Sequence, residues 1–278
     1  MKILVTSASG ANGNGYGQLL VFSMDGKALG AFSSDSRIAD PRGLRVMPGR
    51  QLLYVNSGDD RILALDSRGD VQFDTCHIPG LDAGGGNFGP DGRYYVGLRT
   101  ERTIVAFPPD LDGIGTPILK RGIVPFPRGF AFAADGTLFL ASGVAPDGRG
   151  ENAILLFLPG ADRDSNTFAA DDAVSPLDLA VAAGGNVLVS SEFPFGSHMA
   201  TTSIREYDAR SGALVRVFTP PDDVPFRRPR GLRFGPDGHL YCVALDGVIA
   251  FNYESGRCLG VVIDHPRLNG QAIEFFGD

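Results

Sequence analysis

Three arginines occur in the same short motif at well-separated places in the chain. Arg42, Arg128 and Arg230 each follow a proline and precede a glycine, in the segments PRGL, PRGF and PRGL. A guanidinium carries a permanent charge and a planar fork of donors that matches carboxylate and phosphate oxygens. The sequence therefore predicts an anion-binding site, provided that the fold brings these three side chains together.

A candidate acid or base lies in a different segment. Glu192 ends an apolar run and precedes the aromatic loop FPFGSHMA. Loss of solvent around such a carboxyl group would raise its pKa toward the range in which it can transfer protons. His198, in the same loop, is a candidate proton shuttle. The alternative is that Glu192 is a solvated strand end and His198 a surface histidine.

Metal-ligating residues do not cluster along the chain. No two histidines have the spacing of a zinc site, and the three cysteines have neither metal nor disulfide spacing. Asp162, Asp164 and Asn166 begin a calcium-loop spacing, but the glycine and the acid that would complete it are missing. We expect no cofactor, and a structural or catalytic calcium ion is the alternative.

The bulk composition excludes several classes of protein. The chain has 278 residues, 43% of them hydrophobic, and a net charge of −7. A general nucleic-acid binder needs an excess of lysine and arginine, so we expect no nucleic-acid partner. No apolar run approaches the length of a membrane span, so we expect no membrane association. Unpaired cysteines and the lack of a basic-then-apolar leader favour a cytoplasmic protein, unless an export signal preceded this numbering.

The N-terminal segment resembles a nucleotide-binding loop only in part. An apolar run and a glycine-rich stretch, MKILVTSASGANGNGYG, are followed by QLLVFSMDGKALGAF. A phosphate-binding loop requires a helix directly after its glycines. Here two short apolar runs flank a Met-Asp-Gly turn, which is typical of strand, turn and strand. We therefore reject a dinucleotide site and predict that residues 1–8 form a strand.

A repeat of roughly 40–50 residues runs through the whole chain. Each unit contains a first strand, a tight glycine turn and three further short strands, the last of which leads outward. Alignment of the units places Gly43 with Gly85, Gly129, Asp178, Gly231 and Ala272. The C-terminal segment NGQAIEFFGD supplies only a first strand, which the N-terminal strands complete. The pattern predicts one all-β domain, residues 1–278, folded as a single six-bladed β-propeller that its two termini close.

The PRGL-type first strands, the turns Pro90–Gly92 and Pro236–Gly238 and the segment YVNSGDDRILALD carry a family resemblance. The chain resembles NHL-repeat propellers and, more broadly, the regucalcin/gluconolactonase and strictosidine-synthase-like group. This resemblance implies a ligand site at one mouth of the central channel. In the regucalcin-like enzymes it also implies a divalent metal, held by residues just before the first-strand glycine. The matching positions here hold no carboxylate: Arg42, Gly84, Arg128, Leu177, Arg230 and Gln271.

In a six-fold ring the three arginines stand in alternate blades and would converge on the axis. We therefore expect a small-molecule enzyme, a hydrolase or lyase, that binds an anionic substrate in the channel mouth without a catalytic metal. Glu192 and His198 would be catalytic. The expected substrate-binding residues are Arg42, Arg128, Arg230, Gln271, Asn56, Asp246, Tyr16 and Phe195.

Three alternatives remain open. The chain is a non-catalytic propeller that binds a ligand or a protein on one face, or it is a metal-dependent lactonase like gluconolactonase. In the third, each arginine pairs with a structural carboxylate, for which the candidates are Asp40, Asp178, Glu192 and Asp246. The sequence leaves the oligomeric state open.

Overall fold

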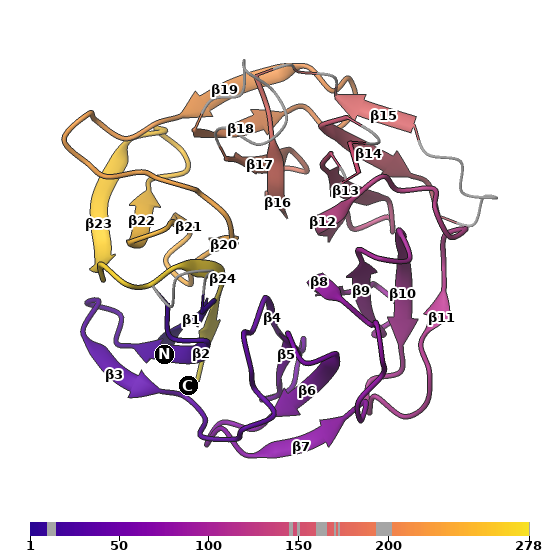
Figure 1. Ribbon diagram of the computed structural model, residues 1–278. Coiled ribbons are helices and arrows are strands. Elements are labelled where there is room, and N and C mark those ends of the chain that lie inside the picture. Colours follow the sequence, from indigo (N-terminus) through magenta and orange to yellow (C-terminus); the bar gives the residue numbers. More distant parts are fainter. Residues whose placement is uncertain are drawn as a thin grey trace.

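The computed structural model describes residues 1–9, 15–144, 147–148, 151–159, 166–169, 171, 173–192 and 202–277. Within these residues the chain forms six four-stranded antiparallel sheets, arranged as blades around a central axis (Figure 1). The structure thus confirms the six-bladed all-β propeller predicted from the repeats. No helix in the described part of the chain is long and apolar enough to cross a membrane.

Five blades each use four consecutive strands, which run outward from the channel. Blade 1 contains β4 (Gly43–Val46), β5 (Leu53–Ser57), β6 (Arg61–Leu65) and β7 (Val71–Asp74). Blade 2 contains β8 (Ala83–Phe88), β9 (Tyr94–Leu98), β10 (Thr103–Phe107) and β11 (Thr116–Pro117). Blade 3 contains β12 (Pro127–Phe132), β13 (Leu138–Ser142), β14 (Ala153–Phe157) and β15 (Asn166–Ala169). Blade 4 contains β16 (Pro176–Val181), β17 (Val187–Ser191), β18 (Ser203–Tyr207) and β19 (Leu214–Phe218). Blade 5 contains β20 (Leu232–Phe234), β21 (Leu240–Val243), β22 (Gly247–Phe251) and β23 (Cys258–Asp264).

Blade 6 joins the two ends of the chain, as the sequence predicts. Its strands, from the channel outward, are β24 (Gly270–Phe276), β1 (Lys2–Ser7), β2 (Gln18–Phe22) and β3 (Ala28–Ala31). β24 pairs with β1 in antiparallel register, from Lys2 opposite Phe276 to Thr6 opposite Ala272. The N- and C-termini therefore lie close together in this blade (Figure 1). This pairing closes the ring, and it covers a strand edge that would otherwise be open.

The hydrophobic core is divided among the interfaces between neighbouring blades. Each of the six clusters found in the described residues combines side chains from two adjacent blades. The second strand of a blade is covered on both faces, so β9 and β13 are buried along their whole length. This explains their continuous apolar sequences, whereas the outermost strand β3 is exposed at every residue.

The inner strands approach one another closely at the aligned glycine position. A Cβ added to Gly231 would lie 2.7 Å from the Cα of Ala272 and 3.0 Å from the backbone nitrogen of Ile273 in the next blade. We call this level, formed by Gly43, Gly85, Gly129, Asp178, Gly231 and Ala272, the glycine level.

A bulge accompanies the glycine level in several inner strands. In blade 3, Pro127 pairs with Ser142 and Phe130 with Leu140, so one extra residue is accommodated between them. The equivalent shift occurs in β8 and β16. A bulge redirects the side chains beside it. Arg128 consequently faces the channel although it lies next to the glycine level.

We predict that Gly231→Ala lowers the free energy of unfolding by about 1–3 kcal/mol, because the added methyl group meets backbone atoms of β24 that cannot move aside. The matched control is Gly184→Ala in the turn before β17, where an added Cβ meets nothing within 4 Å. It should change the free energy by less than about 0.5 kcal/mol. Urea denaturation measures both, and equal effects would contradict the packing argument.

Candidate functional site

A cavity of about 330 Å³ occupies one end of the central channel. We call it the central cavity. The residue just before the glycine level contributes to its lining in every blade, and we call these six residues the upper ring: Arg42, Gly84, Arg128, Leu177, Arg230 and Gln271. The three arginines of the PRG motifs therefore surround one cavity.

A second set of lining residues comes from the positions directly after the second strands of the blades. Arg99 follows β9, Glu192 follows β17 and Ala8 follows β1, and all three line the central cavity. Their backbone N–H groups donate to the loops that lead into the inner strands, as in the 3.1 Å bond from Glu192 to the Ser175 carbonyl. These bonds hold the strand ends at the rim of the channel.

Arg42 and Arg99 share one carboxylate on one side of the cavity. Arg42 Nη1 lies 2.8 Å from Asp82 Oδ1, and Arg99 Nη2 donates to the same oxygen. Asp82 itself does not line the cavity. It is held from behind by backbone and side-chain contacts, including the Thr100 hydroxyl at 3.0 Å. One negative charge thus compensates two guanidinium groups.

Arg230 and Glu192 form a second group on the opposite side. Glu192 Oε1 lies 3.4 Å from Arg230 Nη2 and 3.0 Å from Arg228 Nε. Gln271 accepts a hydrogen bond from Arg230 Nη1 through its side-chain oxygen. Glu192 is buried, with a side chain only 3% exposed. Again one carboxylate is shared between two arginines.

Arg128 lacks a charged partner. Its Nη1 donates to the Pro176 carbonyl at 2.9 Å and lies 3.5 Å from the Ser175 hydroxyl, and it makes no ion pair with any described residue. Its guanidinium lies 5.7 Å from the Phe126 ring centroid, within the range of a cation–π contact. A Cβ on Gly143 would lie 2.5 Å from Cζ, Nε and Nη2. The guanidinium therefore occupies the space that a Cβ at position 143 would take.

The environment of Arg128 disfavours its charge. Burial lowers the pKa of its guanidinium to about 10, Glu192 opposes this shift, and Arg230 adds to it. The group nevertheless remains protonated at neutral pH. Arg128 is consequently a charged, partly desolvated donor whose Nε and Nη2 have no hydrogen-bond partner among the described residues.

The central cavity is positively charged although the protein is acidic. Five arginines line it against two carboxylates, which leaves three positive charges in the lining, and Asp82 behind it offsets one. The whole chain carries a net charge of −7. The excess of positive charge is thus confined to the central cavity. The cavity lining also contains Phe126, Leu177 and glycine backbone.

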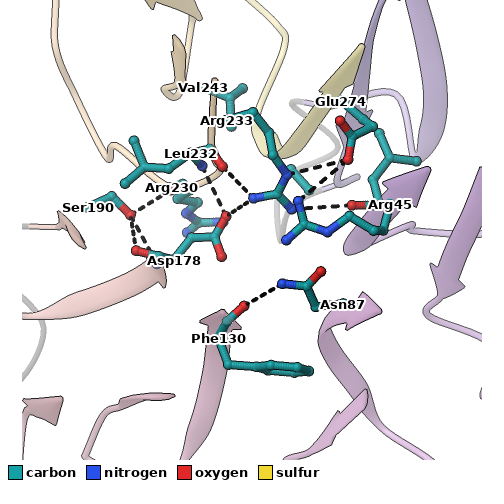
Figure 2. Close-up of polar contacts among 12 residues, drawn as sticks. Arg45, Asn87, Phe130, Asp178, Ser190, Arg230, Leu232, Arg233, Val243 and Glu274 are labelled. Atoms are coloured by element: carbon teal, nitrogen blue, oxygen red, sulfur yellow. Dashed lines mark hydrogen bonds and ion pairs between the residues drawn. The ribbon is translucent and has the colours of Figure 1, made fainter. Parts of the chain in front are cut away.

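A second group of charges lies below the glycine level (Figure 2). It involves the residues two positions after that level, which we call the lower ring: Arg45, Asn87, Ala131, Ala180, Arg233 and Glu274. Arg233 Nη1 lies 3.0 Å from Asp178 Oδ2, and Arg233 Nε and Arg45 Nη1 each lie 3.5 Å from Glu274 Oε2. Two cations face two carboxylates, so this level is neutral.

Arg233 links the two levels of the channel. It lines both the central cavity and a smaller cavity of about 220 Å³ that also contacts Arg45 and Asn87. The Asp178 carboxylate accepts from Arg233 and from the Leu232 backbone N–H at 3.0 Å. This aspartate stands where most blades have glycine, and its carboxylate ties blade 4 to blade 5.

The structure brings together only part of the predicted site. Arg42, Arg128, Arg230, Gln271 and Glu192 line the central cavity. His198 and Phe195, and with them the aspartates of the calcium-like spacing, lie outside the described residues.

Three other predicted residues do not line the central cavity. Asn56 is buried, donating to the Gly84 carbonyl at 2.8 Å and accepting from the Tyr94 hydroxyl at 3.0 Å. Asp246 pairs with Arg227 at the rim. Tyr16 packs against His265, with ring centroids 5.3 Å apart. The polar groups of Asn56 and Asp246 are thus engaged in local contacts.

Sequence reasoning did not assign Phe126, Arg228, Arg233 or Glu274 to the site. A signal for two of them was present, because the repeat alignment read two residues beyond the glycine level gives Arg45, Asn87, Arg233 and Glu274. The sequence analysis also named Asp178 as a candidate partner for the PRG arginines. In the structure Asp178 pairs with Arg233. Arg228 and Phe126 share an aligned position, three residues before the glycine level, but the residue type there differs from blade to blade.

The cavity does not fit the divalent metal implied by the regucalcin-like resemblance. In the described part of the chain, no three His, Cys, Asp or Glu side chains are grouped so that they could hold a metal ion. The upper ring offers guanidinium groups instead of oxygen ligands, and hard cations require several oxygens.

Comparisons with solved structures show the propeller fold. The chain matches a propeller from a nidogen/laminin complex with a TM-score of 0.75 at 14% identity, covering 98% of this chain and 97% of that chain. A gluconolactonase from Xanthomonas campestris matches with a TM-score of 0.64 at 20% identity, covering 81% and 76%. A virginiamycin B lyase from Staphylococcus aureus matches with a TM-score of 0.60 at 15% identity, covering 84% and 73%.

No protein-family model matches the chain, and no curated protein sequence is significantly similar to it. At these identities the structural likeness extends to the fold and not to a shared function. Similar folds include enzymes and a protein-binding propeller, so the function must be argued from the site.

The contrast between Arg128 and Arg233 gives a stability prediction. We expect Arg128→Met to leave the free energy of unfolding unchanged or to raise it by about 1 kcal/mol, because it removes a desolvated charge that lacks an anionic partner. Arg233→Met should lower it by about 3 kcal/mol, since it leaves Asp178 and Glu274 without their shared cation. Denaturant titration at neutral pH tests this, and equal losses would show that Arg128 is structural.

Proposed function

We propose that the central cavity binds a small organic anion, with a carboxylate or phosphate group held by the arginines of the upper ring. The observation that carries the proposal is Arg128. It is charged, partly desolvated and unpaired among the described residues, a costly arrangement that an anionic ligand would relieve.

The geometry around Arg128 favours a forked contact. Its Nη1 is engaged by the Pro176 carbonyl, whereas Nε and Nη2 are both without partners among the described residues. These two N–H groups point along parallel directions and match the two oxygens of a carboxylate or phosphate. Arg42 and Arg230 line the same cavity and would supply further charge. Phe126 and Leu177 offer apolar surface for the rest of the ligand.

Catalysis on the bound anion is the second candidate function, because Glu192 lines the same cavity. As a hydrolase or lyase, the protein would use Glu192 to move a proton while the arginines stabilise developing negative charge. Glu192 is held at the cavity by its contacts with Arg228 and Arg230. A binding role requires no such step and is the simpler proposal.

The binding proposal predicts that sulfate and malonate bind to the wild-type protein and that Arg128→Ala weakens this binding by at least about tenfold, the loss typical of a charged hydrogen-bonded contact. Arg128→Lys should restore little, because an ammonium group lacks the fork. Isothermal titration calorimetry at low ionic strength measures the affinities.

The matched control is Arg121→Ala, which also removes one positive charge. Arg121 is 68% exposed and pairs with Glu101 away from the cavity. Its loss should change the affinity by less than about twofold. Equal effects of both alanine variants, or no binding of either anion to the wild-type protein, would overturn the proposal. Native mass spectrometry of the purified protein would identify an anion that remains bound.

The catalytic candidate has its own test. If a co-purified anion is a substrate, wild-type protein should convert it to a product of changed mass, and Glu192→Gln should slow this conversion by about 100-fold or more while still binding the anion. Mass spectrometry of the small-molecule fraction follows the conversion. Unchanged conversion by Glu192→Gln would exclude Glu192 as the group that moves the proton.

A further inference from the structure

We infer that Arg228 is a positioning residue that sets the anion affinity of the central cavity by drawing the Glu192 carboxylate away from Arg230. The inference rests on the proposed anion binding. It assigns a function to a residue that does not line the cavity and lies outside the repeated PRG motif.

The contacts of Glu192 carry the first step. A single oxygen, Oε1, receives both arginines, and Arg228 Nε at 3.0 Å is nearer than Arg230 Nη2 at 3.4 Å. Arg228 is 44% exposed and approaches from the rim, whereas Arg230 is 20% exposed and belongs to the cavity wall. The closer partner of the buried carboxylate is therefore the arginine outside the cavity.

The backbone at Arg228 follows the repeat. Its φ of +52° lies in the left-handed region, as it does at Asp40, Asp82 and Asn269, which also lie three residues before the glycine level. Consecutive arginines thereby reach different carboxylates, because Arg227 pairs with Asp246 and Arg228 with Glu192.

The charge balance gives the consequence. Arg228 and Arg230 contact the single carboxylate of Glu192, and its charge also acts on Arg128. With Arg228 in place, part of the Glu192 charge is compensated from outside, and Arg230 keeps charge available for a ligand. Without Arg228, the whole carboxylate would act on Arg128 and Arg230 and would oppose an incoming anion.

The experiment measures sulfate binding to four proteins by calorimetry: wild type, Arg228→Ala, Glu192→Gln and the double variant. Arg228→Ala should weaken sulfate binding by about three- to tenfold, and Glu192→Gln should strengthen it by a similar factor, as expected for directly coupled neighbours. In the Glu192→Gln background, Arg228→Ala should have less than about a twofold effect, because the carboxylate through which it acts is gone.

Arg227→Ala is the matched control, since it removes the neighbouring charge from the same loop while leaving Glu192 untouched. We expect less than about a twofold change for it. An equal loss for Arg227→Ala, or the same loss for Arg228→Ala in both backgrounds, would show a general charge effect and overturn this inference alone. Failure of wild-type protein to bind sulfate or malonate would instead overturn the proposed function, and this inference with it.

Discussion

The structure depends on the close approach of six inner strands around one axis. At the glycine level a Cβ on Gly231 would come within 2.7 Å of the neighbouring strand, and similar contacts surround Gly85 and Gly129. Side chains are therefore excluded from this level in most blades. With the exception of Asp178, the charged side chains enter the channel above or below this level, so the constraint divides the channel lining into two rings of residues.

The two rings differ in their charge balance. In the lower ring, Arg45 and Arg233 face Glu274 and Asp178, and the ion pairs connect neighbouring blades. In the upper ring the arginines exceed their carboxylate partners, and Arg128 has none among the described residues. Buried charges that are paired can be accommodated in a stable fold, whereas an unpaired buried charge lowers the stability of the folded protein. The upper ring is thus the part of the channel that stability alone does not explain.

The sequence predicts the fold better than it predicts the site. The repeat fixes the number of blades and the shared position of Arg42, Arg128 and Arg230, because a repeated backbone places equivalent residues equivalently. It does not reveal which carboxylate each arginine meets, since those partners come from loops and from neighbouring blades. Asp82 and Arg228 occupy the same aligned position, three residues before the glycine level, but the other blades hold Asp40, Phe126, Ser175 and Asn269 there, so the residue type does not repeat. Asn56 is polar, so the sequence suggests a ligand contact. In the structure its side chain instead binds the Gly84 carbonyl and the Tyr94 hydroxyl.

The pairing of β1 with β24 also bears on how the molecule reaches its native state. The residues that meet there, such as Lys2 and Phe276, are separated by almost the whole chain. Contacts of such long sequence separation form late, because the entropy of closing the loop must be lost first. Until β24 arrives, the inner edge of β1 presents unpaired backbone groups that a second unfolded chain could occupy. The strand pair that completes the ring is therefore also the point at which folding competes with association between chains.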